Sequence, residues 1–164
     1  MIALARKALG RTAVAVSLLA VQACVAGDFS DAPRPYDEKA DARAAIAAAL
    51  ADNPQRKPVL LAFGGNWCSD SRALEAHFQS PALAPLIESS FRVVHIDVGM
   101  FHRNLDIVEE YGNPIDKGIP SVVLLDPEGK VLFVNHGDLS SARTMSDKAV
   151  REYFERLAER ATVN

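Results

Sequence analysis

Runs of apolar residues change period along the chain, and each period predicts a helix or a strand. Residues 59–63 are wholly apolar, which is typical of a central strand that is covered on both faces. Ile46 and Leu50, by contrast, lie one helical turn apart among good helix formers. The pattern predicts, in order, helix 37–51, strand 59–63, helix 68–78 with an apolar continuation (83–87) beyond Pro81, strand 91–97, helix 105–111, strands 121–125 and 131–134, and a final helix that follows Ser146.

The order of these segments predicts how the strands pair. A strand, a helix and a second strand between residues 59 and 97 favour a parallel pair, because the helix carries the chain back across the sheet. Asp126-Pro127-Glu128-Gly129 has the residues that a tight turn prefers, which predicts an antiparallel hairpin. Ser146 is the expected N-cap of the last helix, and Met145 lies where it packs against Val150. We therefore expect an α/β fold with a central mixed sheet of about four strands and helices on both faces.

Residues 1–26 differ from the rest of the chain. They contain three basic residues, no acidic residue and the apolar run 13–21, which is the pattern of a secretory signal peptide. This run is shorter than the roughly 18 residues of a membrane-spanning helix. Two processing alternatives stay open: Val21-Gln22-Ala23-Cys24 resembles a bacterial lipoprotein box with Cys24 lipidated, while the small residues before Gly27 suit an ordinary signal peptidase. Both alternatives predict export to a bacterial periplasm, with a lipid on Cys24 as the expected membrane attachment in the first.

The composition of the chain is that of one ordinary globular domain. The chain has 164 residues, of which 49% are hydrophobic and 24% charged, and this excludes collagen-like, disordered and multi-domain classes. We expect a flexible lead-in over 27–35 within an N-terminal part (27–54), followed by the main domain (55–164). The signal peptide holds three of the 18 basic residues and none of the 21 acidic ones, so the exported chain has a net charge of −6. Nucleic acid is therefore excluded as an expected partner.

Cysteine and histidine usage argues against a metal site. The sequence contains two cysteines, Cys24 and Cys68, which excludes a four-cysteine zinc site and a disulfide-stapled miniature fold. The four histidines have none of the short spacings that metal ligands show. We expect neither a metal nor a cofactor, and we expect Cys68 to act as a single thiol. The histidines are His77, His95, His102 and His136.

Candidate chemistry is concentrated where a buried strand turns into a helix, at Cys68. A cysteine there has its sulfur near the first-turn N–H groups and the positive end of the helix dipole, and both favour thiolate over thiol. Arg72 adds a positive charge one turn further on, whereas Asp70 and Glu75 oppose it, so the sign of the net effect stays open. Ser71, three residues after the cysteine, lies on the same helical face and is able to donate a hydrogen bond to the sulfur.

Two motifs in this order resemble the thioredoxin family. Trp67-Cys68-x-x-Ser71 follows a strand at a helix start, and Gly118-Ile119-Pro120 precedes the hairpin. The resemblance covers residues 55–160. It implies a thioredoxin-like fold in which the proline is cis and faces the cysteine. It also implies that Ile119 and Pro120 form a ledge for a substrate peptide. Trp67, next to the cysteine, is a candidate platform for the same substrate.

The sequence departs from the family at three positions. Ser71 stands where the family usually has a second cysteine, and that second thiol is what releases a mixed disulfide. Ala62 aligns with the family's buried acid, and Val93 lies near its lysine partner. Our hypothesis is therefore a monomeric, monothiol exchange protein: Cys68 attacks a protein or peptide disulfide, or a glutathione adduct, and an external thiol releases the product.

Other interpretations of the same residues stay open. A redox-inactive binding module would use the groove around Trp67 and Pro120 to hold a peptide or protein partner, and a third alternative is a covalent homodimer through Cys68. Cys68 could also be an inert half-buried side chain, Trp67 simple packing, and Ser71 a first-turn hydroxyl that bonds local backbone. The polar segment 104–117 shapes substrate access or is an ordinary connecting loop.

Overall fold

The wholly apolar segments of the sequence form the centre of a sheet. In the computed structural model, which describes residues 31–162, β1 (Val59–Gly64) and β3 (Ser121–Leu125) are buried along their whole length. The strand order is β2-β1-β3-β4. β2 (Arg92–Asp97) pairs parallel with β1, while β3 pairs antiparallel with β1 and with β4 (Val131–Val134). The mixed four-stranded sheet is therefore confirmed. The expected signal peptide and Cys24 lie outside the described residues.

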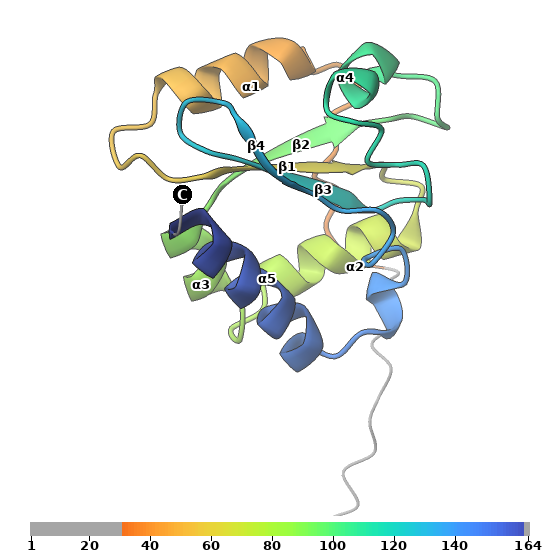
Figure 1. The fold of residues 1–164 in the computed structure, drawn as a ribbon. Helices are drawn as coiled ribbons and strands as arrows, with labels where there is room; N and C mark the ends of the chain where they lie inside the picture. Colours follow the sequence, from red (N-terminus) through yellow and green to blue (C-terminus); the bar gives the residue numbers. More distant parts are fainter. Residues whose placement is uncertain (1–30, 163–164) are drawn as a thin grey trace, which may run out of the picture.

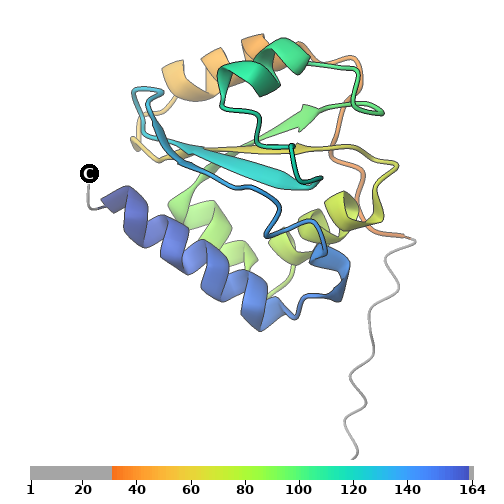
Figure 2. The same cartoon turned by 45° about the vertical axis from the view of Figure 1, so that its right-hand side comes forward.

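Helices cover both faces of this sheet (Figure 1 and Figure 2). Two helices lie on one face and three on the other, with a short 3-10 turn (Ala142–Thr144) next to the start of the second helix. This arrangement confirms the expected layers. The helices are α1 (Ala42–Ala51) and α4 (Leu105–Glu110) on the first face, and α2 (Ser69–Phe78), α3 (Ala84–Ser90) and α5 (Asp147–Thr162) on the second.

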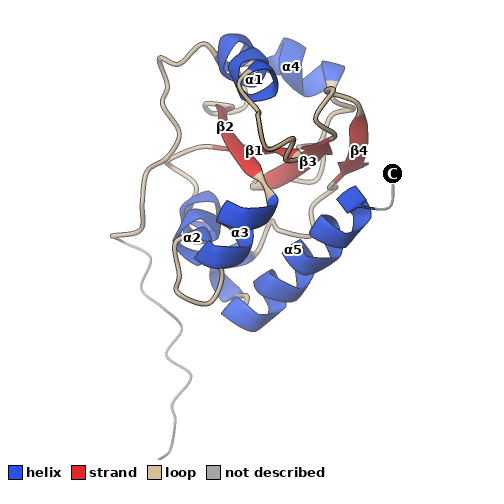
Figure 3. Ribbon diagram, turned by 90° about the vertical axis from the view of Figure 1, so that its left-hand side faces the viewer, coloured by secondary structure: helices blue, strands red, loops and turns tan. Residues whose placement is uncertain are grey.

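Side chains of β1 alternate between two separate cores. Leu61 and Phe63 pack in the layer of α1 and α4, while Leu60 packs on the other face with α2 and α5. Figure 3 shows the sheet between these two layers of helices. All three are fully buried, and each contributes about 1.5–3 kcal/mol by leaving water. Because β1 is held from both faces, the turn that follows it has a defined position.

The N-terminal helix begins later than the sequence pattern predicts. We expected it to start at Asp37, but α1 starts at Ala42, with Asp41 as its N-cap and the Asp41 carboxylate accepting from Ala44 N–H at 2.9 Å. The Asp37 carboxylate accepts from Lys39 N–H at 2.8 Å and so stabilises a separate turn. Aspartate bonds its own backbone readily, and the second aspartate of the pair is the one that starts the helix.

The end of the lead-in that the structure describes, from residue 31, and Tyr36 after it make hydrogen bonds to the rest of the domain. The Arg72 guanidinium donates to Ala32 O at 2.7 Å, and Tyr36 is buried. Asn66 clamps the same segment from the other side: its amide nitrogen donates to Tyr36 O at 2.6 Å, and its amide oxygen accepts from Tyr36 N–H at 3.2 Å. These hydrogen bonds join the lead-in to the turn that carries Cys68 and to the first part of α2.

The hairpin and the last helix follow their sequence signals. Gly129 N–H donates to Asp126 O at 3.0 Å, closing the tight turn between β3 and β4. Ser146 Oγ accepts from Ala149 N–H at 3.2 Å, so Ser146 caps α5 as predicted. Within residues 31–162, no helix combines the length and apolar character needed to cross a membrane.

Candidate functional site

Cys68 lies in the turn between β1 and α2. Its N–H donates to Gly65 O at 3.0 Å and its carbonyl accepts from Arg72 N–H at 3.1 Å. We expected the helix to start at Cys68, but it starts at Ser69, because Cys68 keeps extended backbone angles (φ −84°, ψ 117°) and acts as the N-cap. The half-buried thiol thus lies at the end of α2 where backbone N–H groups have no partner within the helix, and negative charge is favoured there.

The two motifs of the sequence meet at the sulfur. The Ile119–Pro120 peptide bond is cis, and the Cys68 thiol donates to Ile119 O at 3.7 Å. Ile119 and Pro120 are both buried, so the carbonyl at the sulfur belongs to a fixed piece of backbone. The structure therefore brings together the cysteine and the ledge residues that the sequence singled out.

Trp67 is held beside the thiol and projects toward solvent. Its indole N–H donates to Gly99 O at 2.7 Å, and its ring meets Phe101 edge-on with ring centres 5.9 Å apart. About half of its surface stays exposed. A fixed and accessible indole next to a thiol is able to act as a platform for an incoming chain.

Ser71 does not make the hydrogen bond to the sulfur that the sequence suggested. Its hydroxyl is fully buried and has no hydrogen bond of good geometry to any of residues 31–162. It lies beside Gly64 and the Tyr36 hydroxyl instead: a methyl group on Gly64 would collide with that phenol and lie 2.7 Å from Ser71 Oγ, and Ser71 acts on the Tyr36 hydroxyl as a polar neighbour. Glycine at position 64 is what lets the phenol and Ser71 approach β1 together.

Arg72 and Asp70, expected to tune the thiol, bond to other parts of the chain. The Arg72 guanidinium donates to Ala32 O, as described above. The Asp70 carboxylate accepts from Arg143 N–H at 3.1 Å and lies 3.8 Å from the guanidinium of the same residue. Both residues therefore fix neighbouring segments around the start of α2.

A buried polar cluster lies on the inner side of α2. The Glu75 carboxylate bonds His95 Nε2 at 2.8 Å and accepts from the Gln79 amide at 2.8 Å. Burial alone would raise the pKa of Glu75, but the bonds from His95 and Gln79 outweigh burial and hold it below its usual range. The Tyr36 ring meets the His95 ring edge-on, and burial, followed by the charges of Glu75 and Cys68, raises the pKa of Tyr36 far above its usual value.

Comparison with known proteins identifies the family. The sequence model described as thioredoxin-like matches residues 38–127. The chain belongs to the thioredoxin-like family. A solved structure described as a disulphide isomerase from Xylella fastidiosa Temecula1 is 44% identical, with a TM-score of 0.73, and the match covers 76% of this chain and 97% of that one.

Two further solved structures are less similar to this chain. The C-terminal domain of Neisseria meningitidis DsbD, in its reduced and oxidised forms, is 24% identical with a TM-score of 0.48, and the match covers 71% of this chain and 96% of that one. The comparison with curated proteins gives no match.

Sequence reasoning missed the partners of the inner cluster. In this thioredoxin-like sheet the register places His95 opposite Ala62, the position that aligns with the family's buried acid. Glu75 then supplies a carboxylate from α2 instead of from the strand. A usable signal was present, because Glu75 lies one turn beyond Ser71 on the same face of the helix. The contribution of Tyr36 had no signal, since it comes from outside the motif.

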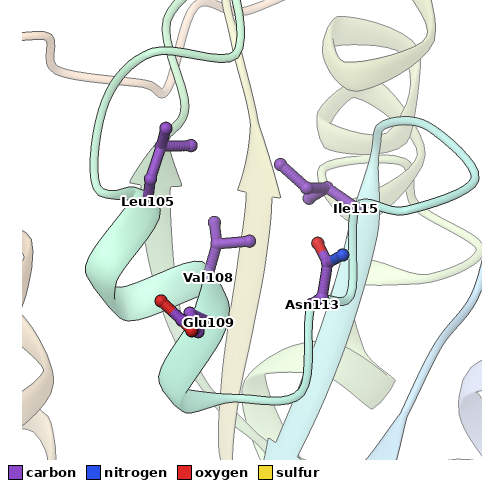
Figure 4. Close-up of a pocket in the computed structure, with 5 residues that line it drawn as sticks. All are labelled: Leu105, Val108, Glu109, Asn113 and Ile115. Carbon is purple, nitrogen blue, oxygen red and sulfur yellow. The ribbon is translucent and has the colours of Figure 1, made fainter.

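A recess of about 320 Å³ lies between α4 and the segment that leads to the cis proline (Figure 4). The side chains of Leu105, Val108 and Ile115 point into it, so this part of the polar segment 104–117 has an apolar inner surface.

Within residues 31–162, no group of three or more His, Cys, Asp or Glu side chains is arranged to hold a metal ion.

Proposed function

We propose that this chain is a monothiol thiol–disulfide exchange protein with Cys68 as its nucleophile. The observation that carries the proposal is the Cys68 thiol at the N-cap of α2, 3.7 Å from the carbonyl that precedes the cis proline. A nucleophile needs an accessible sulfur, and a substrate needs fixed backbone to lie against. The half-buried Cys68 thiol and the buried Ile119–Pro120 backbone lie next to each other.

The proposed reaction has two balanced steps. The Cys68 thiolate attacks one sulfur of a substrate disulfide; that S–S bond breaks, a mixed disulfide forms, and the other substrate sulfur leaves as a thiolate. A second thiolate then attacks the mixed disulfide and frees Cys68. If the second thiolate is the substrate's own, the disulfide is isomerised without net oxidation. If it comes from glutathione, the freed substrate sulfur carries that glutathione in a new mixed disulfide. A second glutathione then breaks this bond, which gives oxidised glutathione and the substrate dithiol.

The need for an outside thiol follows from Ser71. A second cysteine at this position would release the mixed disulfide from within the chain, and a buried hydroxyl has no such chemistry. Isomerisation and removal of glutathione adducts suit a single thiol better than net reduction does. The 44% identical protein described as a disulphide isomerase supports this reaction class. Export of the chain, expected from residues 1–26, would place it in an oxidising compartment where such exchange is required.

The experiment is turnover of a scrambled disulfide protein in a glutathione buffer. We expect catalysis by the wild-type protein, loss of catalysis in Cys68→Ser, and, in Ser71→Cys, turnover that depends less on added glutathione. No turnover by the wild type, or full activity in Cys68→Ser, contradicts the proposal. Binding of the scrambled protein that Cys68→Ser leaves intact, without any turnover, would indicate the redox-inactive binding module instead.

A further inference from the structure

Asn135 is a fully buried polar residue that directly follows β4. Its N–H donates to Val122 O at 2.9 Å, and its carbonyl accepts from the Ser121 hydroxyl at 2.9 Å. Its side-chain oxygen Oδ1 accepts from Gly137 N–H at 3.1 Å and lies 3.1 Å from the Ser121 hydroxyl oxygen. The side-chain nitrogen donates to the Tyr153 hydroxyl at 2.8 Å. Every polar atom of Asn135 therefore has a partner, as buried polar atoms require.

The partners of the Asn135 side chain fix its orientation. A backbone N–H only donates, so the atom that faces Gly137 N–H is the amide oxygen. The amide nitrogen then points to Tyr153, whose hydroxyl accepts from it. Burial raises the pKa of Tyr153 far above its usual value, so the phenol keeps its proton and stays neutral. The amide oxygen is thus held toward Ser121 and Gly137.

The bond to Ser121 holds the ledge from its C-terminal side. The ledge is Ile119 and Pro120, and the Ile119 carbonyl lies 3.7 Å from the Cys68 sulfur. Ser121 directly follows Pro120 in the chain and is fully buried. Its hydroxyl lies within hydrogen-bond distance of both oxygens of Asn135, so the end of the ledge is joined to the end of β4.

The turn 137–140 holds the ledge from its N-terminal side. A methyl group on Gly137 would come within 2.9 Å of Lys117 Cβ, and one on Gly118 would lie 3.6 Å from Ser140 Cβ. The turn thus packs closely against the two residues that precede the ledge. Because the buried amide oxygen accepts from Gly137 N–H, it also sets where this turn begins. One side-chain oxygen therefore serves both flanks of the ledge.

Strand pairing alone does not need this side chain. The bond from Asn135 N–H to Val122 O, which continues the pairing of β4 with β3, would form with any residue except proline. Burial of an amide costs free energy that burial of an apolar side chain does not, and hydrogen bonds offset that cost. A buried asparagine at this position is therefore explained by what its side chain holds, which is both flanks of the ledge.

We propose that Asn135 is a positioning residue for exchange through Cys68, because it fixes the ledge backbone against which a peptide disulfide lies. This inference rests on the proposed function. The hydrogen bonds of Asn135 go to the flanks of the ledge and to Tyr153. A ledge that is fixed before binding loses little conformational entropy when a peptide lies against it. Asn135 should therefore act on substrate binding, which KM reports, and leave the chemical step at the sulfur unchanged.

The test compares three variants with the wild type. Asn135→Ala removes the amide, and Asn135→Asp keeps an oxygen that accepts from Ser121 and Gly137 while its second oxygen accepts from the Tyr153 hydroxyl. The matched control is Ile87→Ala, which removes a buried apolar side chain of α3 and so lowers stability without changing either flank of the ledge. Urea denaturation measures the stability of all four proteins.

In the turnover arm, a synthetic peptide carries one cysteine joined by a disulfide to a reporter thiol, and glutathione sustains release of the reporter. We expect Asn135→Ala to raise KM about tenfold with kcat within about twofold of the wild type. Asn135→Asp should recover a KM within about threefold, and Ile87→Ala within about twofold, of the wild-type value. Alkylation of Cys68 by iodoacetamide, which needs no ledge, should proceed within about twofold of the same rate in all four proteins.

Several results overturn the inference. These are an unchanged KM in Asn135→Ala, an equal rise of KM in Ile87→Ala, a KM in Asn135→Asp as high as in Asn135→Ala, or a fall in kcat and in the alkylation rate. If Asn135→Ala does not fold, Ser121→Ala takes its place, because it removes one flank bond and no amide. We then expect KM to rise about threefold with kcat unchanged, and an unchanged KM overturns the inference.

The binding arm needs no sulfur chemistry. Absence of release by the wild type contradicts the proposed function, and the binding arm then decides the inference. Cys68→Ser protein is titrated with the same peptide carrying serine in place of cysteine, and emission of Trp67, the single tryptophan of the chain, is the readout. We expect addition of Asn135→Ala to weaken binding about tenfold. Equal binding with and without Asn135→Ala, or no binding by Cys68→Ser itself, overturns the inference.

Discussion

The two sides of the start of α2 have opposite polarities. The outer side presents Trp67 and the half-buried thiol of Cys68 to solvent, while the inner side buries Ser71 and Glu75. Soluble proteins usually show the reverse, with polar groups outside and apolar groups inside. The comparison teaches that the buried polar groups of the inner side hold the helix start in place, while Trp67 and Cys68 on the outer side stay accessible to solvent.

The inner side achieves this by joining three segments. Glu75 comes from α2, His95 from β2 and Tyr36 from the lead-in, and their side chains bond or pack against one another. A buried carboxylate without partners would be unstable, so each of these contacts restricts where α2 lies. The position of Cys68 over the cis proline therefore depends on polar contacts that never reach the sulfur.

The largest expected effect comes from breaking the inner pair. His95→Leu leaves the Glu75 carboxylate buried with Gln79 as its remaining hydrogen-bond donor, and we expect the free energy of unfolding to fall by about 3–5 kcal/mol. Urea denaturation measures this directly. The control is the double variant His95→Leu with Glu75→Leu, which should lose less than the single variant because no charge is left buried. A single variant as stable as the wild type would contradict the role of the pair.

The outer side should respond in the opposite way. Trp67→Ala removes one hydrogen bond to Gly99 O and a ring that is already half-exposed, so we expect unfolding to become easier by only about 1 kcal/mol. Exchange on a peptide disulfide should fall about tenfold, equivalent to about 1.4 kcal/mol of lost binding. Parallel urea and turnover measurements check both values. A loss of stability as large as that of His95→Leu would mean that Trp67 is structural packing.

Much of this comparison was accessible from the sequence, for a physical reason. The strands, the hairpin turn and the Ser146 cap are set by residues close together in the chain, and local patterns predict them. The meeting of Cys68 with Ile119 was predicted because two motifs of one family occurred in order. The helix start at Ala42 was missed because Asp37 and Asp41 are both good capping residues, and sequence alone does not rank them.

The inner cluster and the exposed side chains of the loop between β2 and α4 were missed for a different reason. Tyr36, Glu75 and His95 are distant in the chain, and only the packing of α2 on the sheet brings them together. The loop between β2 and α4 has no period, so Met100 and Phe101 carry no signal of exposure. The direction of a side chain was also not predictable from the sequence: Ser71 has the right spacing to reach the sulfur but faces Gly64 and Tyr36.

Lowering the pH should reduce the free energy of unfolding by a smaller amount, through Glu75 on the inner side. The folded state holds the pKa of Glu75 below its ordinary value of 4.5, so its contribution to stability is fully present above that value. That contribution is lost as pH falls through the lowered pKa, because protonation weakens the bonds to His95 and Gln79. We expect the free energy of unfolding to drop between about pH 5 and pH 2, and to drop less steeply in Glu75→Gln. Identical acid profiles for the two proteins would contradict this.

The smallest expected effect tests to which of the two sides Ser71 belongs. Ser71→Ala removes a buried hydroxyl that has no hydrogen bond of good geometry, and we expect stability to be unchanged or to rise by up to about 1 kcal/mol. Exchange through Cys68 should stay within about twofold of the wild type, because the hydroxyl belongs to the inner side. Urea denaturation and glutathione-supported turnover measure the two quantities. A tenfold loss of turnover at unchanged stability would instead assign Ser71 to the outer side, as a donor to the sulfur once a substrate displaces the thiol from Ile119 O.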